Sequence, residues 1–379
     1  MKEIVLKTNG AKYKLEDIIV SALLIMFVIS WTSSNLKQLF GPIIVFLSFF
    51  LSIILLFRLK ISKKNITLLM FMIMLNTIFL FLENHGTGNY IFIIYFIIML
   101  LSMGGARLNT NLEKKIRVFL LVFNILYILV LKSSLNANMQ SLILLATYTI
   151  GINSFSFKQK KLMWNIILCL IRIIVFIINL NYLEFLDCRS ALIAFVFYNI
   201  IMLVPKNISS KKIVLNIALF TCIVGSFIFM TYYISSWENN ENIEISFSDK
   251  QFFSGRELIW SYTFDELKKA PITGIGSSYG YYENSSIGLD DSHNAMLQLL
   301  KSNGIIVFSV IIILIIKNYK YILIYGNTED KFNIYSFVSL MILCFSESFL
   351  CDFGANLLII FPLYSSISKI NERKKEYEI

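Results

Sequence analysis

Charged residues are scarce in this chain. Only 15% of its 379 residues are Asp, Glu, Lys or Arg, whereas 57% are hydrophobic. Soluble domains carry about 25% charged residues, so this chain has more apolar surface than a water-soluble fold can bury. A soluble fold is therefore excluded, and an integral membrane protein is indicated. The low charge also excludes intrinsic disorder, which requires low hydrophobicity together with high net charge.

Cysteine is rare, and the common metal and nucleotide motifs are absent. The five cysteines are too few for a disulfide framework, and Cys169, Cys222 and Cys344 lie inside apolar runs. The sequence has no C-x-x-C pair and no HExxH, DxD, P-loop or dinucleotide-binding glycine pattern. We therefore expect no metal and no other cofactor.

The abundant feature is apolar runs close to the roughly 20 residues that a helix needs to cross a bilayer. Twelve membrane-spanning helices are predicted, at approximately 17–35, 39–57, 65–82, 90–105, 118–133, 140–156, 162–181, 189–205, 213–236, 304–319, 333–351 and 354–369. The predicted fold class is an all-α polytopic membrane protein, with residues 1–379 forming a single membrane domain. Mostly polar residues precede the first span without a small-residue cleavage site, so this span is expected to be a retained anchor.

The distribution of Lys and Arg supports this division, because basic residues near span ends are retained in the cytoplasm. If both termini are cytoplasmic, most of the 34 basic residues fall in segments predicted to be inside. The external ones are Lys37, Lys132, Arg189, Lys250, Arg256, Lys268, Lys269 and Lys301. Most of the net charge of +10 is then a topology signal on a multi-pass protein, and we expect no nucleic-acid partner.

One connection is much longer than the others. Residues 237–303 form a predicted external loop, and loops longer than about 15 residues are usually functional or disordered. Two short amphipathic helices are predicted within it. The first has Ser254 as its N-cap, and the second has Asp291 or Ser292 and meets the next span near Gly304. We expect these helices to lie over the bundle and to cover a cavity.

The sequence contains only two histidines. His85 lies in a short external turn, where a solvated turn residue is the simpler interpretation. His293 opens the second loop helix beside Asp291 and Asn294. A neutral imidazole there can accept a proton near neutral pH, and a neighbouring carboxylate can orient its other nitrogen and raise its pKa. The alternative is a histidine that caps or packs.

Two external arginines are not required by the topology. Arg256 begins the first loop helix, and Arg189 lies at the outer entrance of a span. A guanidinium offers paired donors that match phosphate oxygens, so these two are candidates for clamping a diphosphate. The alternative for each is a surface ion pair, with Glu257 for Arg256 and with Glu184 or Asp187 for Arg189.

Two charged residues fall inside predicted spans. Arg172 lies near the centre of the seventh span, where an unpaired charge costs about 2.5–3.5 kcal/mol, so it is expected to face the protein interior or a polar cavity. A structural pairing and a functional role both remain open for it. Glu347, near the outer end of the eleventh span, is a candidate partner for an arginine or a second acid/base group.

The external loop resembles that of a known family. The segments SGRELIW, KKAPITGIG and DDSHNAMLQLLKSNGI, in this order before a span, are similar to the large external loop of the O-antigen polymerase and O-antigen ligase superfamily. The element Cys188-Arg189-Ser190-Ala191 resembles the Ser-Arg-Gly/Thr-Ala element of the family, with Cys188 in place of Ser. The close resemblance covers about residues 185–310.

The resemblance implies a membrane-embedded glycosyltransferase with a GT-C-like helical bundle, an undecaprenyl-diphosphate-linked donor and a metal-independent, inverting reaction. Arg189 and Arg256 match the family's arginines and would hold the diphosphate. His293 matches the family's loop histidine and would deprotonate the acceptor hydroxyl. Candidates for supporting roles are Asp291, Asn294, Arg172, Glu347 and Trp260.

Aromatic residues are frequent in the external loop. They are candidate platforms for sugar rings, namely Trp260, Tyr262, Tyr279, Tyr281 and Tyr282. An aromatic belt at the membrane interface is the alternative interpretation.

We therefore expect a surface-polysaccharide polymerase that transfers a growing lipid-linked chain onto the next lipid-linked repeat unit, at the outer face of a bacterial cytoplasmic membrane. Its expected partners are the lipid-linked donor and acceptor, the bilayer, a chain-length regulator and a flippase. One alternative is the ligase that transfers the finished chain to a terminal acceptor. Another is a lipid-linked oligosaccharide flippase or other transporter, which would place polar groups near the midplane; only Arg172 favours this class.

Overall fold

The computed structural model describes residues 5–8, 11–58, 63–82, 87–105, 108–130, 136–153, 162–239, 255–277, 280 and 286–377. Within these ranges the chain is helical apart from one antiparallel hairpin, in which Val5 pairs with Lys14 and Thr8 with Ala11. The hairpin was not expected from the sequence. His85, Tyr279, Tyr281 and Tyr282 lie outside the described residues.

The elements follow one another along the chain as β1 Val5–Thr8, β2 Ala11–Lys14, α1 Leu15–Ser30, α2 Ser34–Arg58, α3 Lys63–Leu82, α4 Thr87–Ser102, η1 Met103–Gly105, α5 Thr110–Leu129, α6 Ala137–Ile152, α7 Leu162–Phe185, α8 Arg189–Leu203, α9 Lys206–Ser209, α10 Lys212–Phe220, the π-helix η2 Thr221–Gly225, α11 Ser226–Glu238, α12 Arg256–Lys269, α13 Ala295–Tyr325, α14 Thr328–Leu343, η3 Phe349–Cys351 and α15 Ala355–Tyr377. Each of the twelve apolar segments predicted above falls largely on a described helix. The eleventh helix is shorter than predicted, because α14 ends at Leu343.

Several helices are apolar enough to lie in a bilayer. Within the described part of the chain, the long apolar candidates for membrane spans are Ser34–Ile54, Asn165–Phe185, Lys212–Glu238 and Ala295–Tyr325. Shorter apolar helices accompany them at Asp17–Ser30, Asn65–Phe81, Tyr90–Gly105, Ala137–Ile152 and Arg189–Leu203. Large apolar side chains also face outward, with Leu203 85% and Phe81 82% exposed. Exposure of this kind is unfavourable in water and favourable in lipid, so the protein is a helical membrane protein.

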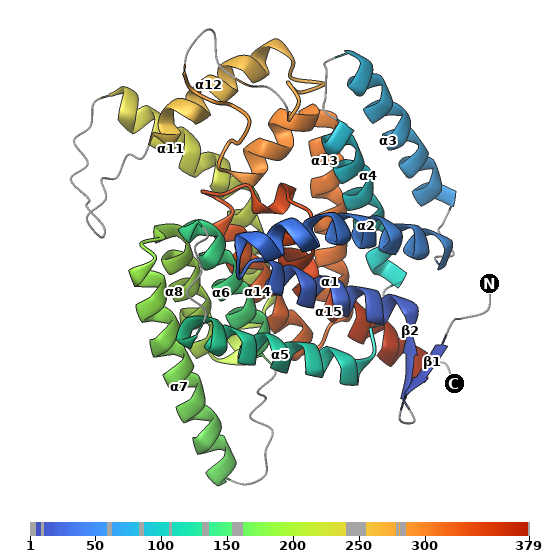
Figure 1. The fold of residues 1–379 in the computed structure, drawn as a ribbon, viewed down its shortest axis with the longest axis vertical. Coiled ribbons are helices and arrows are strands. Elements are labelled where there is room, and N and C mark those ends of the chain that lie inside the picture. Colours follow the sequence, from blue (N-terminus) through green and yellow to red (C-terminus); the bar gives the residue numbers. More distant parts are fainter. Residues whose placement is uncertain are drawn as a thin grey trace.

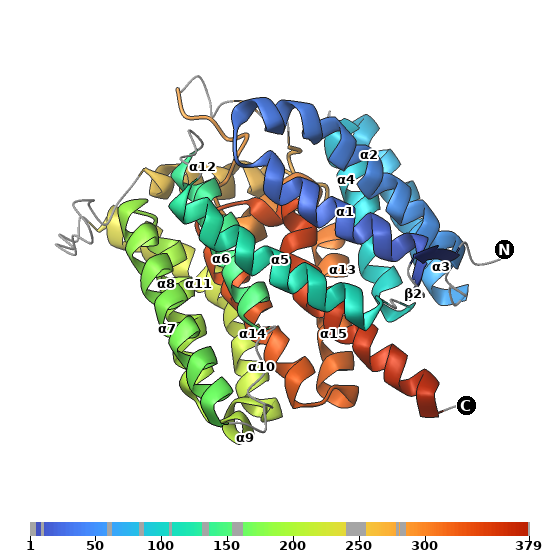
Figure 2. The ribbon, with the colours of Figure 1, turned by 60° about the horizontal axis from the view of Figure 1, so that its bottom comes forward.

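The bundle is built around buried helices. α14 packs against α6, α8 and α15, and the described residues of α6 from Gln140 to Ile152 are all buried. α3 and α7 lie at the periphery (Figure 1). In both views α12 lies at one end of the molecule, whereas hairpin β1–β2 and the end of α15 lie toward the opposite end (Figures 1 and 2).

α13 is interrupted near its first third. Gly304 has φ 67° and ψ 177°, outside the helical region. The segment after α12 inserts at this break, because Ile305 N donates to the Pro271 carbonyl at 3.0 Å and Ile275 N donates to the Lys301 carbonyl at 2.8 Å. A Cβ at Gly304 would collide with the carbonyl of Ile272, so this position requires glycine. The hinge predicted near Gly304 is confirmed, and it joins α12 firmly to the start of α13.

Candidate functional site

α12 is fixed against the neighbouring helix α11. Its N-cap is Gly255, with φ 84°, so the predicted cap at Ser254 is wrong. Trp260 is only 1% exposed and packs against Tyr233, with ring centroids 5.2 Å apart. Its Nε1 donates to the Ser292 carbonyl at 2.7 Å. Trp260 therefore has no free face for a sugar ring, and its role is to hold α12 against the segment that precedes His293.

The segment before α13 is held by the first turns of that helix. The buried ammonium group of Lys301 donates to the carbonyls of Leu289 and, at 3.0 Å, of Asp290. Gln298 Oε1 accepts a hydrogen bond from Ser292 N at 2.9 Å, and Gln298 Nε2 donates to the Asp290 carbonyl at 3.1 Å. The backbone of residues 289–292 is thus held by two side chains of α13, those of Lys301 and Gln298.

Asn294 caps α13. Its Oδ1 accepts from the backbone N–H groups of Met296 and Leu297, each at 3.0 Å, and its Nδ2 donates to the Phe345 carbonyl at 2.8 Å. The helix N-cap predicted at Asp291 or Ser292 is therefore wrong by two or three residues. Asn294 supports the site by joining the start of α13 to the chain that leaves α14.

His293 occupies an unusual backbone conformation. Its φ is +46°, a region that residues other than glycine rarely adopt and that costs about 1–3 kcal/mol. Its backbone N–H donates to Asp291 Oδ1 at 2.8 Å. The strain is held in place by the contacts of the flanking residues, and it directs the imidazole toward the chain between α14 and α15.

The imidazole of His293 faces two carboxylates. Its Nδ1 is buried, 3.7 Å from Glu347 Oε2 and 3.9 Å from Asp291 Oδ2, and makes no hydrogen bond to the described residues. The side chain as a whole is 38% exposed, so the accessible surface belongs to the rest of the ring, where Nε2 lies. The buried nitrogen is thus placed for orientation by a carboxylate, and the other nitrogen is available to a ligand.

The pKa of His293 is raised above its ordinary value. The largest cause is the Glu347 carboxylate facing Nδ1, which stabilises the protonated ring. Burial opposes this effect, the negative charges of Asp291 and Glu347 add to it, and the positive charge of Arg256 reduces it. The ring is therefore a better proton acceptor than a free imidazole.

Glu347 lies at the centre of the cluster. Its Oε1 accepts from Arg256 Nη2 at 2.8 Å and from Asn138 Nδ2 at 2.5 Å, while Oε2 faces His293. The predicted ion-pair alternative for Arg256 named the wrong carboxylate, because Glu257 Oε1 instead accepts from Gly255 N at 3.0 Å. The Arg256 side chain remains 24% exposed.

Arg189 lies at the same end of the bundle. Its helix, α8, packs on α14 through a hydrogen bond from Ser339 Oγ to the Ala194 carbonyl at 2.8 Å. Arg189 is the first residue of α8, and Glu347 follows the last turn of α14. The two helices run in opposite directions through the contact, so these two ends lie on one side.

Arg172 lies elsewhere. Its Nη2 is 3.4 Å from the carbonyl of Ile152, the last residue of α6. Asn138 and Glu347 meet at the opposite end of α6, so Arg172 is separated from the cluster by the length of this helix. This contact with the C-terminal end of α6 fits the structural alternative for Arg172, because a cation is favourable at a helix C-terminus.

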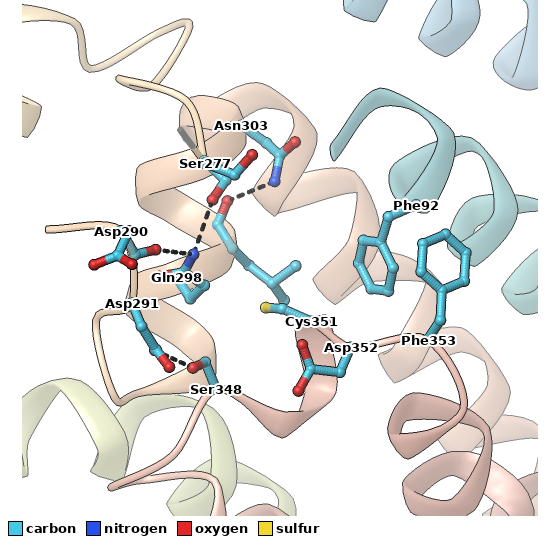
Figure 3. Close-up of a pocket in the computed structure, with 12 residues that line it drawn as sticks. Phe92, Ser277, Asp290, Asp291, Gln298, Asn303, Ser348, Cys351, Asp352 and Phe353 are labelled. Carbon is cyan, nitrogen blue, oxygen red and sulfur yellow. Dashed lines mark hydrogen bonds between the residues drawn. The ribbon is translucent and has the colours of Figure 1, made fainter. Parts of the chain in front are cut away.

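A pocket opens beside the cluster. Its volume is about 420 Å³, and Figure 3 shows its lining: Phe92, Ser277, Asp290, Asp291, Gln298, Leu299, Ser302, Asn303, Ser348, Cys351, Asp352 and Phe353. Asp291 belongs to both the pocket and the cluster, because its Oδ1 accepts from His293 N and from the Ser348 hydroxyl. A cavity under the loop helices was expected from the sequence, but the contribution of Phe92, Asp352 and Phe353 to its lining was not. The contact of Asn138 with Glu347 was not anticipated either, since it joins residues far apart in the chain.

Comparison with protein families gives one match. Residues 174–312 match the family model described as O-Antigen ligase. The resemblance to the O-antigen polymerase and ligase superfamily is confirmed. The matched residues include Arg189, Arg256 and His293, whereas Glu347 lies beyond them. No curated protein and no solved structure matches the chain.

The match to the O-antigen polymerase and ligase superfamily agrees with the geometry. Such proteins act on lipid-linked polysaccharides at a membrane, and this chain combines apolar helices with one cluster of ionisable groups at the end of the bundle that carries α12. Among the described residues, no group of three or more His, Cys, Asp or Glu is arranged to hold a metal ion. Independently of this, the guanidinium group of Arg256 in the cluster has the donor geometry that suits a phosphate-bearing ligand.

Proposed function

We propose that this protein is a polysaccharide polymerase that moves a growing chain from one undecaprenyl diphosphate onto the next lipid-linked repeat unit. The observation that carries the proposal is the cluster of His293, Glu347 and Arg256. It combines a base, a carboxylate facing that base and a guanidinium, at the end of the bundle to which Arg189 also belongs.

In the proposed reaction His293 acts as general base. The acceptor hydroxyl gives its proton to Nε2, and its oxygen forms a bond to the anomeric carbon of the donor sugar. The bond from that carbon to the diphosphate breaks, and its electron pair leaves with the diphosphate. Attack and departure occur on opposite faces of the carbon, so the configuration inverts. The carboxylate of Glu347 stabilises the imidazolium ion that forms.

The two arginines are proposed to bind the leaving group. Arg256 uses Nη2 for Glu347 and is 24% exposed, which leaves other guanidinium donors for phosphate oxygens. Arg189, at the N-terminus of α8, adds a second cation beside a helix end that itself favours anions. Together they would stabilise the charge that develops on the diphosphate.

The membrane arrangement is part of the proposal. We propose about twelve spans, a GT-C-like bundle and cytoplasmic termini. In support, the predicted apolar segments fall on described helices, and α12 lies opposite hairpin β1–β2 and the end of α15. The distribution of lysine and arginine supports a position of the cluster at the outer face of the cytoplasmic membrane. A flippase would deliver the substrates, and a chain-length regulator is a proposed partner.

A ligase is the second candidate, because the matched family model carries that description. The cluster would serve either reaction, since both displace a diphosphate from an anomeric carbon by a sugar hydroxyl. A deletion strain distinguishes them. Single repeat units on the carrier or on the terminal acceptor indicate a polymerase, whereas full-length chains remaining on the carrier indicate a ligase.

The test of the proposal is complementation of that strain. We expect wild-type protein to restore long polymer on a gel, and His293→Ala to be inserted in the membrane at normal amounts without restoring it. Asp265→Asn is a matched control, because the Asp265 side chain on α12 is 44% exposed and its described ion pair is with Lys268. Long polymer from His293→Ala would contradict the assignment.

A further inference from the structure

The pocket beside the cluster has a lining suited to a sugar. Asp290 and Asp291 lie on one side and the rings of Phe92 and Phe353 on the other (Figure 3). The two rings meet edge to face, with centroids 5.3 Å apart and planes at 89°, so they form a firm apolar wall. Carboxylates that accept from hydroxyl groups, combined with an aromatic wall, suit a ligand with polar edges and an apolar face.

The size and accessibility of the pocket fit such a ligand. Its volume of about 420 Å³ lies within the roughly 300–1,000 Å³ of small-molecule sites. Asp290 and Asp352 are exposed, so both can meet a ligand. Gln298 instead uses its amide group within the pocket wall, where it accepts from Ser292 N and donates to the Asp290 carbonyl.

The charge of the pocket excludes the diphosphate. Its described lining includes the carboxyl groups of Asp290, Asp291 and Asp352 and has no Lys, Arg or His. Desolvation raises the pKa of Asp352 to about 7, so Asp290 and Asp291 carry most of the negative charge at neutral pH. The nearby ammonium group of Lys301 is fully buried and faces the carbonyls of Leu289 and Asp290. An anionic group would be repelled here and attracted by Arg256 instead.

The pocket is also joined directly to the proposed base. Asp291 Oδ1 accepts from the His293 backbone, and Asp291 Oδ2 lies 3.9 Å from His293 Nδ1. A sugar held by the other pocket carboxylates would therefore lie beside Asp291, the residue that contacts His293. This is where a nucleophilic hydroxyl must approach if the donor diphosphate binds the cations.

We propose that this pocket binds the acceptor sugar, and that this sugar is neutral or carries an amino group rather than an acid. The inference rests on the proposed transferase function, and it names the substrate class of one half of the site. The pocket orients the acceptor through Asp290 and Asp352, while His293 removes the proton from its hydroxyl.

A binding experiment separates the two halves of the site. The probe is the repeat-unit oligosaccharide released by mild acid from the carrier of a deletion strain, so that it has no diphosphate. Binding to the full-length protein in lipid nanodiscs is followed by saturation-transfer NMR. We expect Asp290→Asn combined with Asp352→Asn to weaken binding by about tenfold or more, because two hydrogen bonds to charged acceptors are weakened. Arg256→Ala and the control Asp265→Asn should bind as wild type does.

The outcomes are distinct. Unchanged binding in the double variant, or lost binding in Arg256→Ala, would overturn the pocket assignment even if His293→Ala proves inactive. Binding lost only in the double variant, together with polymer made by His293→Ala, would retain the sugar pocket and reject the transfer mechanism. Sugar analysis gives a further check, because a uronic acid at the non-reducing end of the repeat unit would contradict the proposed acceptor class.

Discussion

The protein contains two arginine–glutamate pairs that differ in how completely their groups are used. Arg117 Nε lies 2.6 Å from Glu113 Oε1, with side chains 4% and 2% exposed. The other guanidinium nitrogens of Arg117 donate to the Ile150 carbonyl and to Ser365 Oγ, each at 2.9 Å, and Lys369 Nζ lies 3.1 Å from Glu113. All three guanidinium nitrogens of Arg117 and the Oε1 atom of Glu113 are thus bound within the protein.

The pair of Arg256 and Glu347 has fewer contacts within the protein. Arg256 is 24% exposed, and the second oxygen of Glu347 faces a histidine nitrogen at 3.7 Å, beyond hydrogen-bond distance. A pocket lies beside it. Charged groups that are satisfied internally stabilise a fold, whereas those that keep free capacity beside a pocket can act on a ligand. The comparison assigns Arg117 and Glu113 to the stability of the fold, and it supports the proposal that Arg256 and Glu347 act on a ligand.

The largest expected contrast comes from removing each arginine. Arg117→Ala leaves Glu113 buried with its main partner lost, and we expect it to cost about 3–5 kcal/mol of stability and to reduce the amount of folded protein. Thermal unfolding in detergent measures this. The comparison would fail if Arg117→Ala unfolded at the wild-type temperature.

Arg256→Ala should show the opposite behaviour. We expect a smaller loss of stability than for Arg117→Ala, because Glu347 keeps its contacts with Asn138 and His293. We also expect a fall in transfer rate of about 10²–10³-fold, the usual effect of removing one donor from a developing charge. The rate is measured with lipid-linked repeat units and protein in nanodiscs. Full activity in this variant would show that the exposed guanidinium is not used.

Glu347→Gln tests the electrostatic link to His293. The carboxylate raises the pKa of His293, so the neutral, active ring is lost as the pH falls through that raised value. Removing the negative charge lowers the pKa, and the acid limb of the pH–rate profile should move to lower pH. An unchanged acid limb would mean that Glu347 does not govern this titration.

The smallest effect is expected from Lys268→Ala. Lys268 pairs with Asp265 at 2.8 Å, but the two side chains are 75% and 44% exposed. Such pairs contribute about 0–1 kcal/mol, so stability and polymer length should stay near those of wild type. A clear loss of activity would show that charge anywhere on α12 matters, and would contradict a specific role for Arg256.

Local features of the site were predictable from the sequence. The charged residues of interest lie at places where topology does not require them, and the loop helix that begins at Arg256 and the break at Gly304 follow from local pattern. The similarity to the superfamily was also visible in short segments of the loop, which lie within or overlap the matched residues.

Long-range contacts were not predictable. α14 ends early because its last turns bond to other elements, with the Cys344 carbonyl accepting from Ala295 N at 3.0 Å. That exit brings Glu347 to Arg256 and to Asn138, partners that no local periodicity could identify. Trp260 was a candidate platform for a sugar ring, with an interfacial aromatic belt as the alternative, but packing against Tyr233 buries it.

The central claim is that His293 is the general base. Its most direct test is the single-turnover transfer rate of purified His293→Ala in nanodiscs, at saturating lipid-linked donor and acceptor and with added imidazole. We predict a rate about 10²–10⁴-fold below wild type, with unchanged donor binding and partial recovery by imidazole at pH values where imidazole is neutral. A wild-type rate in His293→Ala would contradict the claim.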